Sequence, residues 1–547
     1  MNASRLRERR ATTMQAIIIA LAATASALAP ARRAAPLKTP TKAAAVADAP
    51  TAVPDRVSKE NPLRVVIAGA GVGGLTLANA LDDCDHVDVT LVEKTSAFKR
   101  FGGPIQLASN AMQLFREMDD DIYDQIEHKF TWTGNLTNGI KDGIRDEWYA
   151  KFDLASPAAA RSMPYTGVIE RPDLQEILLG GLTDGVVANG VGVAGYEKTA
   201  AGGVNVAMED GRVIEADVLV GADGIWSNVR AAMRDEPARG EGSGVSYSGY
   251  TVFAGELNYA SPDNGEVGYK VYIGPNQYFV ITDIGNGRYQ YYAFLARAPG
   301  SAETEAKPDG TVPFLKKTFE GWSPDVHRIL DATKEDEIEQ RDLYDRPPSS
   351  IKPWSDGPVG LLGDAVHAMM PNLGQGGCQA IEDAFVLDQE LRGLRKRSYA
   401  GEALQTYRNR RLVRSASVQG LSRFASDIII RGFDTPAKIV TDDGPVRFEN
   451  FNYAGIVTRL LQPILPVFFT VQFNFLYEGW RNEAALDLKA GVAIFGIGLL
   501  ILAVGAGAVG DLAILLPFAG ESLIGAEAFA GISETISSIL PSVDSLL

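Results

Sequence analysis

The 547-residue sequence predicts an α/β fold in which the main parallel sheet is assembled from separate stretches of chain, joined to a β-rich domain and a helical, hydrophobic C-terminal tail. Three observations support this expectation. Short apolar runs that end in glycine and precede helix-like segments occur at 63–81, 218–230 and 359–390. Alternating aromatic residues between 269 and 295 are typical of antiparallel strands, and residues 491–510 carry no charge.

The first of these stretches carries the glycine pattern G-x-G-x-x-G, with glycines at Gly69, Gly71 and Gly74. A strand-like run precedes it, a helix-like run follows it, and a second strand-like run ends at Glu93, 19 residues after Gly74. In this context the glycines allow a tight turn and the close approach of a pyrophosphate, and the acidic residue suits the ribose hydroxyls of adenosine. The four residues therefore predict a Rossmann-like dinucleotide-binding site.

Two further copies of the pattern, at 190–195 and 505–510, lack this context. Strand-like alternation follows the first copy, so we expect a loop there, with no helix to present its amides. The second copy lies inside an apolar run, where small residues serve packing. The sequence therefore predicts one dinucleotide site, and a second Rossmann domain for NAD(P)H is not evident.

The apolar run from Val359 to Leu362 is expected to be a buried strand, and Gly363 and Asp364 follow it directly. Such a strand delivers one carboxylate to the carboxyl end of the sheet, where open α/β sheets bind their ligands. The carboxylate of Asp364 suits the hydroxyl groups of a sugar alcohol.

The next segment is rich in glycine and begins at Pro371. Gly374, Gly376 and Gly377 let the backbone pass close beneath a flat ring, and a helix is expected from near Gly376 through Glu390. Amides at the N-terminus of such a helix stabilise negative charge, which reduced flavin carries at its pyrimidine edge. The segment therefore predicts a flavin site.

His367 and Cys378 lie in the same region. His367, one of four histidines, is a candidate for acid-base catalysis, and the alternative is that it positions backbone near the cofactor. Cys378 is expected to be a small buried residue at a helix start. The other cysteine, Cys84, is distant in sequence, so no disulfide framework or cysteine metal site is implied, and no metal-binding cluster stands out.

A third strand-to-helix turn, at 218–230, contains Asp223 and Gly224. The order of the glycine motif, this turn and Gly363-Asp364 resembles the single-component flavoprotein monooxygenases of the aromatic-hydroxylase fold. Within that group, the sequence between about 63 and 425 resembles the zeaxanthin epoxidases, which are carotenoid enzymes of plastids. The motifs that carry this narrower resemblance lie at 103–111, 247–250, 267–271, 277–280, 319–322, 341–346 and 369–378.

The resemblance implies FAD as cofactor, with the glycine motif and Glu93 holding its ADP half and Asp364 holding its ribityl or pyrophosphate region. It implies that Arg171 reaches the cofactor, and that Asp223 and Gly224 serve FAD and NAD(P)H. The alternatives are a solvated arginine at a helix start and a plain strand-to-helix turn.

In the chemistry that the resemblance implies, NADPH or a ferredoxin system reduces the flavin, and O2 forms a flavin C4a-hydroperoxide. One oxygen atom then enters the ring double bond of a hydroxylated carotenoid. The implied substrate is zeaxanthin, which gives antheraxanthin and violaxanthin, or diatoxanthin, which gives diadinoxanthin. Two alternatives remain open: a hydroxylase of the same fold acting on a small phenol or another lipid-soluble compound, and a non-catalytic flavin- or carotenoid-binding protein.

The length of the chain suits two or three domains. We expect an FAD-binding domain from 60–245 and 340–400, a β-rich substrate domain from 246–339, and a C-terminal helical region from 401–547. The aromatic side chains of the β-rich domain either line a long apolar groove or pack within the sheet. A long, lipid-facing channel would favour a carotenoid, and a closed, polar pocket would favour a phenol.

The net charge of the chain is −16, yet the first 50 residues hold eight basic and two acidic residues, so the remainder carries about −22. This acidity argues against nucleic acid as a partner. Basic residues, an apolar core and a basic, alanine-rich stretch make residues 1–58 resemble the bipartite signal that directs proteins into complex algal plastids, with a secretory signal as the alternative. We therefore expect a plastid location.

Two apolar segments follow the flavin-related motifs. Residues 491–510 are long enough to span a bilayer, with a buried or hairpin-like docking segment as the alternative. Residues 460–475 are interrupted by Pro463 and Pro466 and are expected at a membrane interface or a substrate entrance. Both would suit an enzyme associated with a thylakoid or envelope membrane.

Overall fold

The computed structural model describes residues 54–96, 103–263, 265–274, 276–348, 352–426, 438–441, 444–447 and 465–478. These residues belong to one compact unit, Pro54–Leu547. Nearly all of the expected targeting segment, the third glycine motif and the uncharged segment 491–510 lie outside the described residues.

The main sheet has six strands. Its spatial order is β18 (Ser355–Asp356), β19 (Val359–Leu361), β12 (Val218–Gly221), β1 (Leu63–Ala68), β2 (Val87–Glu93) and β8 (Val187–Asn189). The strands from β19 to β8 are parallel, and β18 pairs antiparallel to β19. Because β1 lies between β2 and β12, with β19 next to β12, the turns after the expected strands meet at one edge of the sheet.

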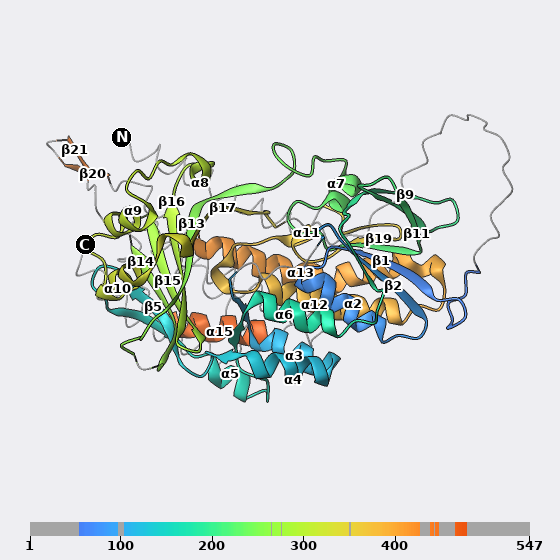
Figure 1. Cartoon of the computed structure of the whole chain (residues 1–547), viewed down its shortest axis with the longest axis horizontal. Coiled ribbons are helices and arrows are strands. Elements are labelled where there is room, and N and C mark those ends of the chain that lie inside the picture. Colours follow the sequence, from blue (N-terminus) through green and yellow to red (C-terminus); the bar gives the residue numbers. More distant parts are fainter. Residues whose placement is uncertain are drawn as a thin grey trace, which may run out of the picture. The chain divides into compact units, whose positions relative to one another are not determined.

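Helix α2 (Val72–Asp82) follows β1 and packs against α12 (Gly376–Arg392), as Figure 1 shows. Gly73 permits this close contact, because a Cβ there would lie 3.0 Å from the Cβ of Ala380 in α12 and 2.5 Å from Cδ2 of Leu362. Both helices agree with the expected ones and bury their apolar residues in the same core as β1. Helices beside them are α3 (Ser109–Met118), α4 (Asp120–Lys129) and α6 (Arg171–Gly180).

Two small sheets flank the main one. The first consists of β11 (Val213–Ala216), β10 (Val204–Met208) and β9 (Val193–Lys198), and helix α7 (Asn228–Arg234) packs beside it. The second consists of β3 (Ile105–Leu107), β7 (Gly167–Ile169) and β4 (Thr131–Trp132). The glycine copy at 190–195 spans the loop after β8 and the first three residues of β9, so a strand and not a helix follows the loop, as expected.

A seven-stranded sheet forms the β-rich part. Its order is β17 (Ile338–Asp345), β13 (Ser246–Asn258), β16 (Arg288–Ala296), β15 (Gln277–Gly285), β14 (Val267–Gly274), β5 (Thr137–Asp142) and β6 (Trp148–Phe152). Strands β5 and β6 come from the range expected for the FAD-binding domain, and β17 crosses the expected boundary at 339. The seven-stranded sheet therefore takes strands from both expected domains, because β5 pairs parallel to β14, a long-range pairing that strand periodicity does not reveal.

The side chains on the two faces of this sheet pack against different neighbours. One set forms a core with α9 (Thr311–Thr318) and α10 (Pro324–Ala332), where Phe319 and Trp322 meet edge to face at 4.9 Å. The other set includes Tyr250, Tyr278 and Phe294 and packs with Met370, which directly precedes the glycine-rich segment. This second face therefore adjoins the expected flavin site.

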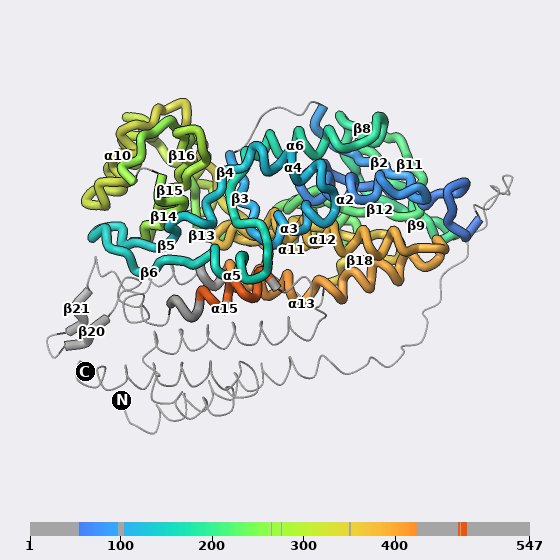
Figure 2. Tube along the Cα trace, turned by 90° about the horizontal axis from the view of Figure 1, so that it is seen from below, coloured from blue at the N-terminus to red at the C-terminus, as the bar shows by residue number. Residues whose placement is uncertain are grey.

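Helix α13 (Ala400–Ser426) follows α12 and lies beside it, and a helix was expected in this range. A short hairpin, β20 (Lys438–Thr441) and β21 (Gly444–Arg447), was not expected within the helical region. Helix α15 (Leu465–Glu478) contacts β6, α3 and α5 (Ala155–Ala159), so it touches both the β-rich part and the helices beside the main sheet (Figure 2). Over the described ranges, no helix has the length and apolar character needed to cross a bilayer. The α/β fold is confirmed.

Candidate functional site

The glycine motif forms the turn between β1 and α2. Gly69 has a φ of +107°, and a Cβ there would lie 2.5 Å from the carbonyl oxygen of Ala222. A Cβ on Gly74 would lie 2.0 Å from the carbonyl oxygen of Gly69, so helix and turn touch directly. At Gly71, by contrast, a Cβ would meet no described atom within 4 Å. Two glycines thus permit close packing, and the third leaves its backbone open to a ligand.

Gly71 is also the N-cap residue of α2, and within the described residues no side chain caps this helix end. Its first amides are therefore available to an anion. Glu93 lies at the carboxyl end of the adjacent strand β2, where its two carboxylate oxygens accept hydrogen bonds from the amides of Ala70 and Thr95, each at 2.9 Å. The acid and the glycine turn thus share one edge of the sheet.

The carboxylate of Asp364 lies at the tip of β19, as expected. It begins the short helix α11 (Asp364–His367) after Gly363, whose φ is +60°. Its side chain is exposed, yet surrounding protein raises its pKa, with His367 and Arg171 opposing that rise. Arg171 is exposed at the first position of α6, and its charge acts on the Asp364 carboxyl.

Asp223 and Gly224 lie in the turn after β12, next to the glycine motif: a Cβ on Gly69 would lie 2.9 Å from the Cα of Asp223. Oδ2 of Asp223 accepts from the amides of Asn228 and Val229 at the start of α7, at 2.8 and 3.3 Å. Burial raises the pKa of this carboxyl, and its Oδ1 is buried without a hydrogen-bond partner among the described residues. Gly224, with a φ of +77°, forms the left-handed position of the turn.

The glycine-rich segment forms a 3₁₀ turn, η2 (Pro371–Leu373), and then α12. Gly374 has a φ of +60°, and a Cβ there would lie 2.8 Å from Nε2 of Gln106 in β3. A Cβ on Gly377 would lie 2.7 Å from the side chain of Ile105, whereas Gly376 faces no described atom within 4 Å. Strand β3 therefore closes one side of this segment, and the first residue of α12 stays open.

The β-rich part reaches the same segment. The hydroxyl of Tyr278 donates to Oδ1 of Asn372 at 2.8 Å, and its ring stacks on Phe294 with centroids 4.1 Å apart. A Cβ on Gly103 would lie 3.1 Å from Oε1 of Gln290. Burial raises the pKa of Tyr278, so its hydroxyl stays protonated. The face next to η2 is therefore aromatic and uncharged at these positions.

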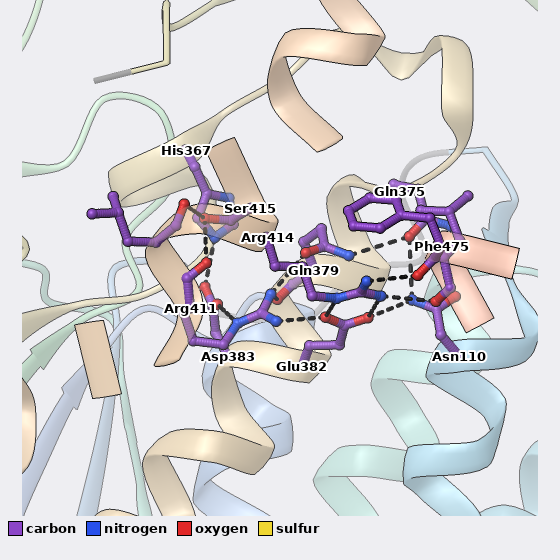
Figure 3. Close-up of polar contacts among 12 residues, drawn as sticks. Asn110, His367, Gln375, Gln379, Glu382, Asp383, Arg411, Arg414, Ser415 and Phe475 are labelled. Atoms are coloured by element: carbon purple, nitrogen blue, oxygen red, sulfur yellow. Dashed lines mark hydrogen bonds and ion pairs between the residues drawn. The ribbon is translucent and has the colours of Figure 1, made fainter. Parts of the chain in front are cut away.

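A buried charged network joins α12 to α13, and the sequence did not reveal it (Figure 3). Glu382 accepts from Nε of Arg414 at 2.6 Å and from Nη1 of Arg411 at 2.5 Å, and Asp383 accepts from Nε of Arg411 at 2.7 Å. All four side chains are at most 2% exposed. Burial raises the pKa of Glu382, but the guanidinium groups outweigh it and hold that pKa at about 2. We name these four residues the α12–α13 network.

His367 belongs to the surroundings of this network. It is 2% exposed, and its Nε2 lies 2.6 Å from Oδ2 of Asp383, which also accepts from the amide of Gly363 at 2.9 Å. The arrangement favours the second reading of His367, in which it positions backbone beside Asp364. Cys378 is buried as expected, and burial raises the pKa of its thiol to about 12.

Together, these elements form one continuous edge. The glycine turn, the Asp223 turn, Gly363-Asp364 and the start of α12 meet at the carboxyl ends of β1, β12 and β19. Open helix amides suit phosphate and flavin oxygens, and exposed carboxylates suit ribose and ribityl hydroxyls. The residues therefore fit FAD. No group of three or more metal-ligating side chains occurs in the part of the chain that the structure describes.

Comparison with known sequences gives a consistent picture. Residues 62–420 match the family described as FAD binding domain. The chain is 40% identical over 399 residues to the chloroplastic zeaxanthin epoxidase of Prunus armeniaca, a match that covers 71% of this chain and 58% of that relative. It is 39% identical to the protein of the same name from Spinacia oleracea, over 70% of this chain and 57% of that one. The chain thus spans less than two thirds of the length of these relatives.

Solved structures share the fold. HpxO of Klebsiella pneumoniae, complexed with FAD and uric acid, has a TM-score of 0.59 at 25% identity and covers 67% of this chain and 88% of that one. A salicylate hydroxylase bound to its substrate has a TM-score of 0.61 at 21% identity, covering 79% and 98%. At that identity, the second likeness shows the fold alone.

Proposed function

The chain belongs to the FAD-binding domain family, and from that premise we propose that it is a flavoprotein monooxygenase that epoxidises the ring double bond of a hydroxylated carotenoid. The observation that carries this proposal is the 40% identity to zeaxanthin epoxidases over 71% of the chain. The substrate is zeaxanthin or diatoxanthin. The phenol hydroxylase alternative has support from the fold alone.

The proposed cofactor contacts follow from the geometry of the site. Gly69, Gly71, Gly74 and Glu93 hold the ADP half of FAD, because Gly71 leaves the end of α2 open beside the Glu93 carboxylate. Arg171 provides positive charge from the start of α6, close enough to act on the Asp364 carboxyl.

The remaining contacts lie at the other end of the cofactor. Gly363 and Asp364 contact its ribityl or pyrophosphate region, and Asp223 and Gly224 form the neighbouring turn. Pro371, Gly374, Gly376 and Gly377 pass beneath the ring, where Gly376 leaves the amides at the start of α12 open.

When reduced and exposed to O2, FAD supplies an electrophilic oxygen atom. The chain's own contribution is to bind, orient and exclude water. The amides at the start of α12 favour negative charge at the adjacent ring edge. The aromatic face around Tyr278 and Phe294 supports an apolar, ring-shaped substrate next to η2, because its buried phenol groups stay neutral.

We propose NADPH or a ferredoxin system as the electron donor, as the similarity to zeaxanthin epoxidases implies. The sequence predicts a single dinucleotide site, which FAD would occupy, so the donor would not need a second Rossmann domain. We also propose a plastid location, which the chloroplastic relatives support, and association with a thylakoid or envelope membrane, where a carotenoid is dissolved. The apolar helix α15, which touches the β-rich part, supports such an association.

The test uses the full chain loaded with FAD, together with NADPH, a reductase system and zeaxanthin or diatoxanthin in lipid. We expect an epoxide whose mass increases by one labelled oxygen atom when the gas is ¹⁸O₂. Gly69→Ala serves as the comparison, because its positive φ and the contact with Ala222 oppose any side chain, so FAD binding and product should fall together.

If the reduced flavin is reoxidised by O2 and hydrogen peroxide is the only product with either carotenoid present, the epoxidase proposal is contradicted. The proposed flavin site would still stand. Oxygen insertion into a small phenol under the same conditions would move the assignment to the hydroxylase alternative.

A further inference from the structure

A cavity of about 320 Å³ lies between the end of β17, the approach to β18, α11 and α13. Three of its lining residues are cationic: Arg234, Arg346 and Lys352. His367 and Gln419 also line it, and Trp354 contributes an aromatic wall. Of the residues proposed to bind FAD, none is among the described lining residues of this cavity.

The charge around this cavity is not balanced. Glu236 accepts hydrogen bonds from Arg230 at 3.0 Å, from Arg346 at 2.9 Å and from Lys352 at 2.9 Å. Arg234 adds a fourth positive charge beside them. Among the described lining residues there is no carboxylate. We name Glu236, Arg230, Arg346 and Lys352 the Glu236 cluster, and its single carboxylate leaves a net positive charge beside the cavity.

Arg346 is held in place before any ligand arrives. Its side chain is 4% exposed, its amide donates to the carbonyl of Ala368 at 3.0 Å, and its own carbonyl accepts from Nε2 of Gln419 at 2.6 Å. Its Nη2 donates to Glu236 and to the carbonyl of Ser243. Its Nη1 is buried without a hydrogen-bond partner among the described residues. An unpaired guanidinium donor in a buried position is costly unless an acceptor reaches it.

The electrostatics agree with this geometry. Burial, together with repulsion from Arg230 and Arg234, lowers the pKa of the Arg346 guanidinium to about 10, despite the attraction of Glu236. Burial likewise lowers the pKa of Arg234 to about 10. Both groups remain charged at neutral pH. Within the Glu236 cluster as the structure describes it, three cations face one carboxylate, and Asp223 also attracts Arg230.

We propose that this cavity binds a small phosphorylated molecule, with the phosphate group beside Arg346, Arg234 and Lys352. A phosphate brings close to two negative charges and three acceptor oxygens, which matches several cations better than a single carboxylate does. Guanidinium forks are suited to such oxygens. The cavity is larger than a phosphate group alone, and its apolar lining by Trp354, Val366 and Leu412 accommodates an organic body. The proposal does not depend on the epoxidase activity.

The test is calorimetric titration of the FAD-loaded full chain with two probes, inorganic phosphate and AMP, at an ionic strength held constant with chloride. We expect saturable binding of at least one probe. Tighter binding of AMP than of inorganic phosphate supports a phosphate ester as the ligand, whereas equal or weaker binding of AMP overturns the organic part of the proposal and leaves a site for the free ion. Loaded FAD keeps AMP out of the dinucleotide site.

Variants connect the binding to the cluster. Arg346→Met should raise the dissociation constant about tenfold or more, and Lys352→Gln should raise it by a few fold, since Lys352 is 44% exposed. Lys396→Gln removes the same charge at an exposed position outside the cavity lining and should leave the constant unchanged. Because Lys352 is half exposed, its variant reports on binding even where Arg346→Met folds poorly.

The proposal fails if neither probe gives saturable heat at millimolar concentration, or if Arg346→Met and Lys352→Gln bind phosphate as the wild type does. Binding that chloride displaces at equal concentration would also overturn it, because a built phosphate site distinguishes a polyvalent anion from a monovalent one.

Discussion

The α12–α13 network and the Glu236 cluster are both built from buried arginines and carboxylates, yet their charges differ. The network pairs two carboxylates with two guanidinium groups, and all four side chains are at most 2% exposed. The Glu236 cluster sets one carboxylate against three cations and borders a cavity. A closed and neutral cluster has nothing left to bind, so it holds helices together, whereas an open cluster with surplus charge can attract a ligand.

The largest expected effect comes from breaking the balanced network. Glu382→Ala leaves two buried guanidinium groups with fewer acceptors, so the free energy of unfolding should fall by about 3–5 kcal/mol. Urea unfolding of the FAD-loaded protein measures it. Glu390→Ala is the matched control on the same helix, because its ion pair with Arg410 at 2.8 Å is partly exposed and should be worth less than about 1 kcal/mol. Equal losses in the two variants would contradict the comparison.

The second-largest expected effect is a loss of stability at low pH, where the carboxylates of the α12–α13 network become protonated. The pKa values of Glu382 and Asp383 are about 2 in the folded protein, against ordinary values of 4.5 and 3.8. Because folding lowers the pKa of both carboxyl groups, their ionised forms stabilise the folded protein fully above about pH 4.5. This contribution to the free energy of unfolding is lost as pH falls from about 4.5 toward 2. We expect a loss on the order of 2–3 kcal/mol from Glu382 across this window. Unfolding measured at pH 5, 4 and 3 tests it, and Glu382→Gln should show a smaller slope.

Arg414→Lys separates charge balance from geometry. The charge is kept, but an ammonium group cannot hold Glu382 and the carbonyl oxygens of Phe475 and Leu476 at once, as the guanidinium does at 2.6 to 3.0 Å. We expect a loss of about 1–2 kcal/mol, read from the same unfolding curves. A variant as stable as the wild type would show that charge balance alone matters.

The smallest effect on stability is expected at the Glu236 cluster. Arg346→Met removes one cation, and Glu236 keeps Arg230 at 3.0 Å and Lys352 at 2.9 Å. The free energy of unfolding should therefore change by less than about 1 kcal/mol. A small increase would also agree with the comparison, because the variant removes a surplus buried charge. A loss as large as that of Glu382→Ala would show that the two clusters serve the same structural purpose.

The parts of the site that the sequence revealed are local. Gly69, Gly71 and Gly74 form the expected turn between β1 and α2, and Asp364 follows its own strand, so spacing along the chain was enough to predict where these residues lie. Their contacts with FAD stay a prediction. The same holds for α12, which begins at the expected Gly376.

The parts that the sequence did not reveal depend on contacts between distant segments. Arg411 meets Glu382 because α13 lies beside α12, and Arg346 meets Glu236 across 110 residues. A charged residue within a polar helix face gives no sign of its partner. The place of β5 and β6 in the seven-stranded sheet was not expected for the same reason, since β5 pairs with β14 and β6 with β5 only in the folded sheet.

Arg414 has a practical consequence for shortening this protein. The family match ends at residue 420, but two nitrogens of the Arg414 guanidinium donate to carbonyl oxygens at 475 and 476. A chain cut at the end of the match would leave those donors buried and unsatisfied beside Glu382. A truncated version prepared for crystallisation or assay should therefore extend through Glu478, the last residue of α15.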